Sequence, residues 1–319
     1  MLIGREKELK SLQEYTNKTN GTIKVMYIYG AKGVGVSSVL RGFAARLARN
    51  DEYTVLYIDS IEGDDVARAV VATDRIKGLV LSMASSTEME PGRALLYTLP
   101  IIAIRLGLPN IRDKRAVIIV DHIDKGIGPT RTPEYLDSLK ASARKLIQWR
   151  ARGVTIIAGG TQLGLQEIEN KGHVLGIAMD FARIVGLEKE PYYKLLESLQ
   201  VNFSLTPSEL WELTGGNPGE TLVLAKRYRG DHLFWLSALK ARLRRVIRII
   251  ENKGLLEELR NALDDLGNIH PRVAEILQAY DIVIRCDKSV LGKEDEYDEC
   301  GLEWQLPVYK KLLTELLSV

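Results

Sequence analysis

The feature that most constrains the fold is an alternation of apolar runs and amphipathic segments over the first 185 residues. A strand that is apolar throughout must be buried on both faces, and helices that connect such strands cover a parallel sheet. The helix-forming spacing is clearest after the first run and over residues 134–152. We therefore predict an α/β core. Its expected strands are Ile23–Tyr29, Thr54–Asp59, Gly78–Ala84, Ala116–Asp121 and Val154–Gly160.

The pattern changes after about residue 187, where helical segments replace the alternation. Two β-rich runs, 282–286 and 302–306, then flank a polar stretch, and a helix closes the sequence. Three helices, two strands and a final helix form the order of a winged helix. We predict three domains: a core at 1–186, a helical lid at 187–235 and a winged-helix domain at 236–319.

Composition excludes several classes of protein. The 44 Lys and Arg residues nearly balance 42 Asp and Glu, which argues against a nucleic-acid coat or an acidic solvating chain. Two cysteines exclude a disulfide-rich scaffold. No apolar run approaches the ~20 residues of a membrane span, and charges interrupt the N-terminus. We expect a cytoplasmic protein without membrane contact, and the seven glutamines favour a thermophilic source.

A glycine-rich segment comes directly after the first predicted strand. It matches the phosphate-loop pattern G-x-x-x-x-G-K-[ST] at every position except one. Glycines let backbone N–H groups face a phosphate, and the next helix directs its positive end there. Ser37 occupies the position that binds Mg²⁺, but Val36 replaces the lysine that neutralises the phosphates. The predicted phosphate-binding residues are Gly30, Lys32, Gly33, Gly35, Val36, Ser37 and Ser38.

Lys32 lies within this loop, where it either supplies a substitute charge or is a solvated surface lysine; we favour the surface interpretation. Asp121 ends the fourth run and is placed to hold Mg²⁺. His122 stands where hydrolytic relatives carry a glutamate that polarises water, and an imidazole is a base in principle. Asp124 reaches the site only if its loop bends back.

The run VTIIAGGT commonly ends in a polar side chain that positions the γ-phosphate. Gly159 and Gly160 offer no such group, although Thr161 follows them. Three hydrolytic positions are thus altered together, at Val36, His122 and this glycine pair. We predict that ATP hydrolysis is absent or close to background.

The sequence resembles archaeal AAA+/STAND ATPases and archaeal origin-recognition initiators. The resemblance rests on Gly4-Arg5-Glu6, on Tyr29-Gly30-Ala31-Lys32, on Thr214-Gly215-Gly216-Asn217-Pro218 and on Asp121-His122-Ile123-Asp124. It implies an AAA+ core with a lid and a winged helix, and ATP or ADP with Mg²⁺ as ligands. It also implies that Arg5 lies beside the adenine and Pro218 near the base and phosphates. The family's arginine after G-N-P is missing, since Gly219 and Glu220 stand there.

Charge is unevenly distributed in the C-terminal third. Residues 226–253 carry nine cations against two acidic residues, whereas 281–303 has eight acidic residues against three basic ones. A basic helix face is either a phosphate-backbone surface or an ordinary solvated face. An acidic wing is a poor DNA surface and favours a protein partner. Any duplex DNA binding should be weak and should use Lys240, Arg242, Arg244, Arg245 and Arg248.

These observations leave three hypotheses for function. The first is a nucleotide-binding or nucleotide-losing pseudo-ATPase that acts as a scaffold or regulator. The second is an active ATPase switch that uses Lys32 and His122. The third is an initiator-like DNA-binding protein with a structural ATPase core.

A hairpin centred near Lys293 would place Cys286 opposite Cys300. Opposed residues in an antiparallel pair lie close enough for a disulfide. Unlinked thiols are the usual state in a cytosolic protein, but hyperthermophilic archaea are an accepted exception. We expect that the bridge, if formed, stabilises the acidic wing.

Overall fold

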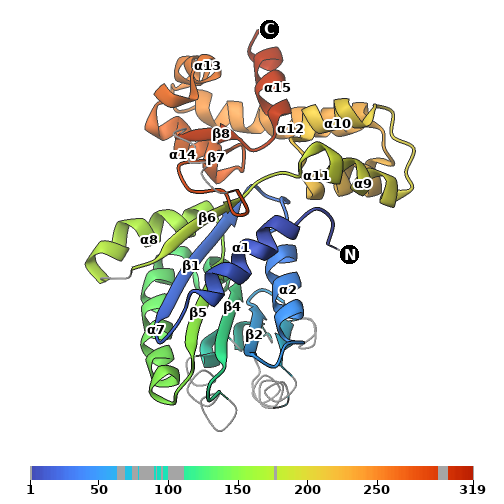
Figure 1. The fold of residues 1–319 in the computed structure, drawn as a ribbon. Helices are drawn as coiled ribbons and strands as arrows, with labels where there is room; N and C mark the ends of the chain where they lie inside the picture. The colour runs from blue at the N-terminus through green and yellow to red at the C-terminus, as the bar shows by residue number, and fades with distance from the viewer. Residues whose placement is uncertain are drawn as a thin grey trace.

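The computed structural model describes residues 2–62, 69–73, 78, 90, 92–94, 96–99, 111–175, 178–293 and 301–318. A sheet with helices on its two faces forms the lower part of the molecule in Figure 1, and the helices of the C-terminal half lie above the sheet. The expected strand at Gly78–Ala84 lies outside the described residues beyond its first residue.

The central sheet has the strand order β3-β2-β4-β5-β1-β6. All neighbouring strands are parallel except β2 and β3, which pair antiparallel at the edge. The non-sequential order requires crossover helices, which is why helices cover both faces. The strands are β1 (Ile23–Gly30), β2 (Tyr53–Asp59), β3 (Val70–Ala72), β4 (Arg115–Asp121), β5 (Gly153–Gly159) and β6 (Asp180–Ile184).

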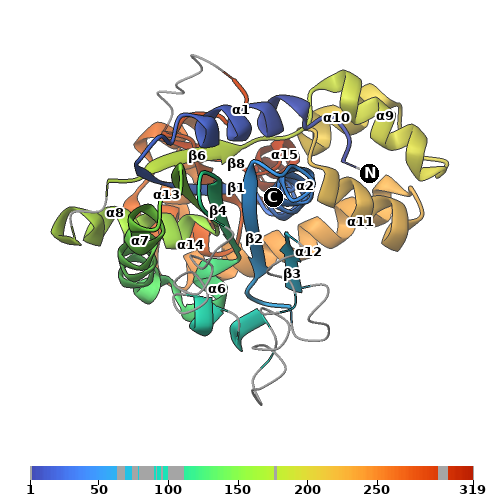
Figure 2. The same ribbon diagram turned by 60° about the horizontal axis from the view of Figure 1, so that its bottom comes forward.

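Two apolar clusters lie on opposite faces of this sheet. One packs residues such as Leu139 and Leu165 against the strands, and the other packs Leu12, Leu40 and Phe43. Figure 2 shows α1 and α7 on opposite sides of the strands. The helices of this part are α1 (Glu6–Asn17), α2 (Val36–Leu47), α6 (Ile123–Ile127), α7 (Thr132–Gln148) and α8 (Gln162–Leu175).

The C-terminal half is helical around a third apolar cluster that runs from Leu187 to Leu313. Its three-helix, two-strand, one-helix order after residue 231 is the predicted one. The division between a lid and a last domain stays a prediction, since this cluster spans both. The elements are α9 (Lys189–Leu199), α10 (Pro207–Thr214), α11 (Pro218–Tyr228), α12 (His232–Glu251), α13 (Leu256–Asp264), α14 (Pro271–Ala279), β7 (Val283–Arg285), β8 (Leu302–Trp304) and α15 (Pro307–Leu317).

The β7–β8 hairpin sits one residue out of the predicted register. Val283 pairs with Trp304, and the Cys286 N–H donates to the Gly301 carbonyl at 3.4 Å, so Gly301 and not Cys300 continues the ladder opposite Cys286. The sequence fixes the loop length but not the turn that sets register, which explains the difference. Cys286 is nevertheless disulfide-bonded, which is one of the two states that the sequence left open. Its expected partner Cys300 lies outside the described residues.

The hairpin region is bound to the sheet by backbone and charged contacts. Arg183 of β6 donates its N–H to the Ser289 carbonyl at 2.8 Å and accepts from the Leu291 N–H at 2.8 Å. The Arg183 guanidinium, 3% exposed, also pairs with Glu303 of β8. Arg285 of β7 pairs with Glu169 of α8 at 2.5 Å. The C-terminal half is therefore fixed against the carboxyl-terminal edge of the sheet.

Reduction of the disulfide should destabilise this hairpin region. A bridge between Cys286 and Cys300 closes a loop of about 15 residues, which is worth roughly 3 kcal/mol by the chain-entropy estimate. We expect a lower Tm with reductant, measured by circular dichroism. Cys286→Ser should melt at the lower temperature with or without reductant. Equal melts of the oxidised and reduced wild type would contradict the prediction.

Candidate functional site: the phosphate loop and its pocket

The phosphate loop joins the end of β1 to the start of α2. Gly33 and Gly35 have φ values of +84° and +104°, a region that side-chain-bearing residues rarely adopt. Gly35 caps α2, which begins at Val36. A Cβ on Gly33 would lie 2.9 Å from Asn217 Oδ1, so another chain segment also demands glycine there. The loop is thus built as the sequence predicts, with its N–H groups at a helix N-terminus.

A pocket of about 630 Å³ opens over this loop. Three regions of the molecule surround it: the ends of β1 and β4, the lid and the hairpin region. The predicted residues Gly30, Lys32, Gly33, Gly35, Val36, Ser37, Ser38, Asp121 and Pro218 all line this pocket. The fold therefore brings together residues that span 189 positions of the sequence, from 30 to 218.

Val36 lies at the floor of the pocket, at the position of the missing lysine. Ideal Cβ atoms placed on Gly30 and Gly159 would lie 3.4 and 3.5 Å from its methyl groups. The side chain is packed against the apolar cluster that contains Leu40 and Phe43. The pocket floor thus presents methyl groups where the family presents an ammonium.

Ser37 and Asp121 are adjacent, as a magnesium–nucleotide site requires. Asp121 is 1% exposed, and the hydroxyl of Ser37 is one of its hydrogen-bond partners. Tyr57 donates its hydroxyl to Asp121 Oδ2 at 3.0 Å, and the His122 N–H donates to Oδ1 at 2.9 Å. Burial raises the pKa of Asp121, against the opposing effect of His122 and Ser37. Hydroxyl and carboxylate oxygens are ligands that suit Mg²⁺, so these two residues fit the ion beside a bound phosphate.

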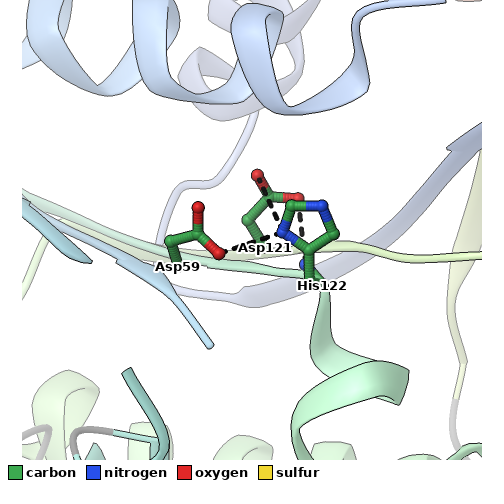
Figure 3. A group of neighbouring side chains, drawn as sticks. All are labelled: Asp59, Asp121 and His122. Atoms are coloured by element: carbon green, nitrogen blue, oxygen red, sulfur yellow. Dashed lines mark hydrogen bonds and ion pairs between the residues drawn. The ribbon is translucent and has the colours of Figure 1, made fainter. Parts of the chain in front are cut away.

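His122 lies beside the carboxylates of Asp59 and Asp121 (Figure 3). Its Nδ1 is 3.0 Å from Asp59 Oδ1 and 3.8 Å from Asp121 Oδ2, while its Nε2 is 3.4 Å from Ser37 Oγ. The residue has φ +52°, and its carbonyl accepts a hydrogen bond from Ser60 Oγ at 2.6 Å. This left-handed turn aims the ring back toward the end of β2.

Mutual contact perturbs the pKa values of this group. Burial opposes ionisation of Asp59, but the hydrogen bond and charge of His122 outweigh it and leave the pKa of Asp59 lowered. Burial likewise disfavours protonated His122, yet the hydrogen bond to Asp59 and the charge of Asp121 leave the pKa of His122 raised. The imidazole is therefore held by carboxylates instead of being directed as a free base toward water.

The glycine pair at the end of β5 has a packing reason. A Cβ on Gly159 would lie 2.8 Å from Asp121 Oδ1, and a Cβ on Gly160 would overlap the Tyr27 hydroxyl. Thr161 does not replace the missing polar group, because its N–H donates to Asp124 Oδ2 at 2.9 Å and its hydroxyl bonds the same oxygen. Asp124 is 2% exposed and engaged in this contact.

Arg5 lies in a second pocket, of about 640 Å³, formed by residues 2–8, 185–188, 190–191 and 290–293 among others. Its guanidinium is 4% exposed and donates to the Val34 carbonyl at 2.7 Å and to Glu8 at 2.5 Å. Arg5 thus ties the N-terminal segment to the back of the phosphate loop. The structure places Arg5 and the phosphate-binding residues in two separate pockets.

Lys32 is fixed by its backbone and not by its ammonium. Its N–H donates to Gln305 Oε1 at 3.0 Å and its carbonyl accepts from Asn217 Nδ2 at 2.8 Å. Its Nζ is 3.7 Å from Asp281 Oδ2, with the side chain 76% exposed. These contacts agree with the interpretation of Lys32 as a surface lysine whose charge faces Asp281.

The sequence reasoning missed two residues of this site, Asp59 and Lys125. Asp59 ends β2 directly beside Asp121 in the parallel ladder, so two neighbouring strands both end in aspartate. The two runs TVLYID and AVIIVD both end in aspartate, and this similarity could have pointed to Asp59. The sequence does not show, however, that the two strands are neighbours in the sheet. Lys125 lines the pocket and is exposed, without an ion pair to any described residue.

The five basic residues of α12 separate into two groups. Lys240 pairs with Glu315 at 2.7 Å, and Arg242 donates to the Tyr309 hydroxyl at 2.9 Å and to the Tyr280 carbonyl. The side chains of Lys240 and Arg242 thus join α12 to other parts of the C-terminal half. Arg244, Arg245 and Arg248 are exposed and make no ion pair within the described part of the chain.

Comparison with known proteins agrees with this geometry. A sequence model described as an ATPase domain predominantly from Archaea matches residues 2–224. The chain belongs to this family of archaeal ATPase domains. A search of curated proteins found no match. No helix within the described residues is long and apolar enough to cross a membrane.

One solved structure shows the same fold at low sequence identity, and two others match more weakly. The *Aeropyrum pernix* ORC2 protein in ADPNP–ADP complexes matches with TM-score 0.52 and 14% identity, over 99% of this chain and 94% of that chain. The *A. pernix* ORC1 protein in complex with DNA gives TM-score 0.40, 16% identity and coverages of 100% and 93%. Cdc6p from Pyrobaculum aerophilum gives TM-score 0.40 and 12% identity, over 98% of this chain and 94% of that chain. The predicted α/β AAA+ fold is confirmed by the first of these.

Replacement of Gly160 by alanine should destabilise the protein by about 1–3 kcal/mol, because the new methyl group overlaps the Tyr27 hydroxyl. Removing that hydroxyl should relieve the overlap. We therefore expect Tyr27→Phe with Gly160→Ala to cost less than the sum of the single changes in urea unfolding. Gly301→Ala is the control, since its Cβ meets no atom of the described residues within 4 Å. Simple additivity would contradict the packing argument.

Proposed function

We propose that this chain is a nucleotide-binding member of its family that hydrolyses ATP at or near background and acts as a regulator or scaffold. ATP or ADP with Mg²⁺ is the expected ligand, held by the backbone of Gly33–Ser38 with Ser37 and Asp121 at the metal. The solved relative from *A. pernix* carries ADPNP and ADP, which supports a nucleotide as the ligand class.

The observation that carries this proposal is the contrast between two halves of one pocket. The phosphate cradle is intact, with Gly33 and Gly35 at positive φ and Ser37 bonded to Asp121. The groups that would drive phosphoryl transfer are replaced by Val36 methyl groups, a carboxylate-bound His122 and packed glycines. Loss of one such electrostatic group costs on the order of 10²-fold in rate.

A regulatory role is supported by contacts between the phosphate loop and the C-terminal half of the chain. Gly219 of α11 donates its N–H to the Gly33 carbonyl at 2.9 Å, and Gln305 accepts from the Lys32 N–H at 3.0 Å. Both the lid and the hairpin region thus bind the phosphate loop directly. A nucleotide that repositions Lys32 would alter the Gln305 and Asp281 contacts, so occupancy would be coupled to the C-terminal half. We assign this half as a winged helix on its element order.

Val36→Lys alone should not restore hydrolysis. It should tighten ATP binding on the order of tenfold, because a charge-assisted contact to phosphate replaces methyl groups. Binding is measured by calorimetry and turnover by phosphate release, with Val36→Met as an uncharged control of similar length. His122 would be a competent base if Val36→Lys matched Val36→Lys/His122→Glu in turnover.

The alternative is an active ATPase switch that uses Lys32 and His122. Measured ATP turnover of the wild-type protein decides between this alternative and the proposal. The proposal would be wrong if purified wild type hydrolysed ATP at ~1 s⁻¹, a typical enzyme rate, and Asp121→Ala abolished it. Under the proposal, ATP hydrolysis by the wild type and by Asp121→Ala should both stay at background.

Duplex DNA binding is a second candidate function, and one surface favours it. Arg244, Arg245 and Arg248 share the exposed face of α12, free of internal ion pairs among the described residues. We propose binding that is weak, tolerant of sequence and steeply dependent on salt.

Charge reversal at Arg244 and Arg245 should weaken duplex binding at low salt, since each phosphate contact contributes a log–log salt slope of about −0.9. Fluorescence anisotropy with a labelled duplex measures both affinity and slope. Arg46→Glu with Arg49→Glu, at exposed positions in the last turn of α2 and just beyond its end, makes the same change in net charge and is the control. Unchanged affinity after reversal at 244 and 245 would refute this surface.

A further inference from the structure

The ends of β2 and β4 gather three metal-ligating side chains that the nucleotide site does not require together. Asp59 and Asp121 are register partners in the parallel pair, and His122 follows directly. One ligand atom from each residue lies within 4.8 Å of the others. We propose that Asp59, Asp121 and His122 bind a first-row transition-metal dication, such as Mn²⁺, Co²⁺ or Zn²⁺, in the absence of nucleotide.

The two distances from the His122 donor nitrogen are close to those between ligands of one ion, and all three donors lie within 4.8 Å of one another. His122 Nδ1 is 3.0 Å from Asp59 Oδ1 and 3.8 Å from Asp121 Oδ2. Donor atoms about 2.1 Å from a metal, at tetrahedral or octahedral angles, are separated by roughly 3.0–3.4 Å. The first pair already has this spacing, and the second reaches it by a shift of a few tenths of an ångström.

Contacts behind the ligands hold each donor in place. Ser37 Oγ lies 3.4 Å from Nε2, the ring nitrogen opposite the donor, and can accept its proton. The Tyr57 hydroxyl and the His122 N–H hold the two Asp121 oxygens, while Ser60 fixes the His122 carbonyl. Metal-bound histidines and carboxylates usually have such outer partners, which set tautomer and orientation.

The donor set selects the class of ion. Mg²⁺ prefers oxygen ligands alone, whereas an imidazole nitrogen favours Mn²⁺, Co²⁺ and Zn²⁺. The nucleotide-linked Mg²⁺ described above uses Ser37 and Asp121 and has no need of Asp59 or His122. Replacement of the family's glutamate by His122 is what adds the nitrogen.

Charge at the site also favours a cation. Two carboxylates face one imidazole, and the only other cation in contact is Arg41, among the described residues, with its guanidinium 3.8 Å from Asp59 Oδ2. That contact uses the other Asp59 oxygen, so Oδ1 remains directed at His122. The His122 side chain is 24% exposed and lines the pocket, which gives an ion a route from solvent.

The test is a Co²⁺ titration of untagged, oxidised, nucleotide-free protein, followed by visible d–d absorption. We expect one saturable site, lost in His122→Ala and weakened at least about tenfold in Asp59→Asn. Asp51→Asn, at an exposed position, and His270→Ala, at the half-buried N-cap of α14, both lie outside the pocket; they are the controls and should bind as wild type. Zn²⁺ should displace Co²⁺, and Mg²⁺ at the same concentration should not.

Three results would overturn the site: no saturable absorption in the wild type, full binding by His122→Ala, or equal competition by Mg²⁺. The His122 ring would then simply pair with the carboxylates of Asp59 and Asp121, with no metal ion between them. Near-ultraviolet circular dichroism checks that the variants fold, and Asp59→Asn decides the matter if His122→Ala does not. Because no nucleotide is present, failure here leaves the proposed nucleotide function untouched, and the reverse also holds.

Discussion

The rest of the structure depends on the approach of two chain segments, 217–219 and the one that holds Gln305, to the backbone of the phosphate loop. Gly219 donates to the Gly33 carbonyl at 2.9 Å, Asn217 Nδ2 to the Lys32 carbonyl at 2.8 Å, and the Lys32 N–H to Gln305 at 3.0 Å. A Cβ on Gly219 would lie 2.6 Å from the Gly33 Cα, so backbone can meet backbone only because both residues are glycine. The loop that would hold a phosphate is therefore also the joint between the sheet and the C-terminal half, and any ligand there acts on that joint.

Packing explains why the altered residues of this pocket form a set. Gly160 leaves space for the Tyr27 hydroxyl, which donates to the Thr161 carbonyl at 2.9 Å, and Gly159 leaves space for Asp121. Thr161 in turn binds buried Asp124. A polar side chain restored at 159 or 160 would displace tyrosine or aspartate before it reached a phosphate. Under the proposed loss of hydrolysis, recovery by one substitution would be opposed by sterics as well as by missing charge.

The sequence predicted those parts of the fold that local pattern determines. Fully buried strands such as β4 and the glycines of the phosphate loop carry their signal within a few residues. Edge strands β3 and β6 escaped prediction because they are short or partly exposed, so their hydrophobic pattern is weak. The hairpin register was wrong by one residue, since turn geometry sets it and composition does not. Asp59 could be placed only once β2 and β4 were known to be neighbours.

The two proposals for this pocket are connected by electrostatics. A triphosphate brings several negative charges to a floor where Val36 supplies none and where Asp59 and Asp121 are already present. Lys32 faces Asp281, which leaves Lys125 as a pocket-lining cation without an ion pair in the described residues. A dication at Asp59, Asp121 and His122 would change the sign of that region and favour phosphate. By linkage, a nucleotide would then raise metal affinity by the same factor that the metal raises nucleotide affinity. A histidine at position 122, where the resemblance implies a glutamate, would in this way add a metal-binding group.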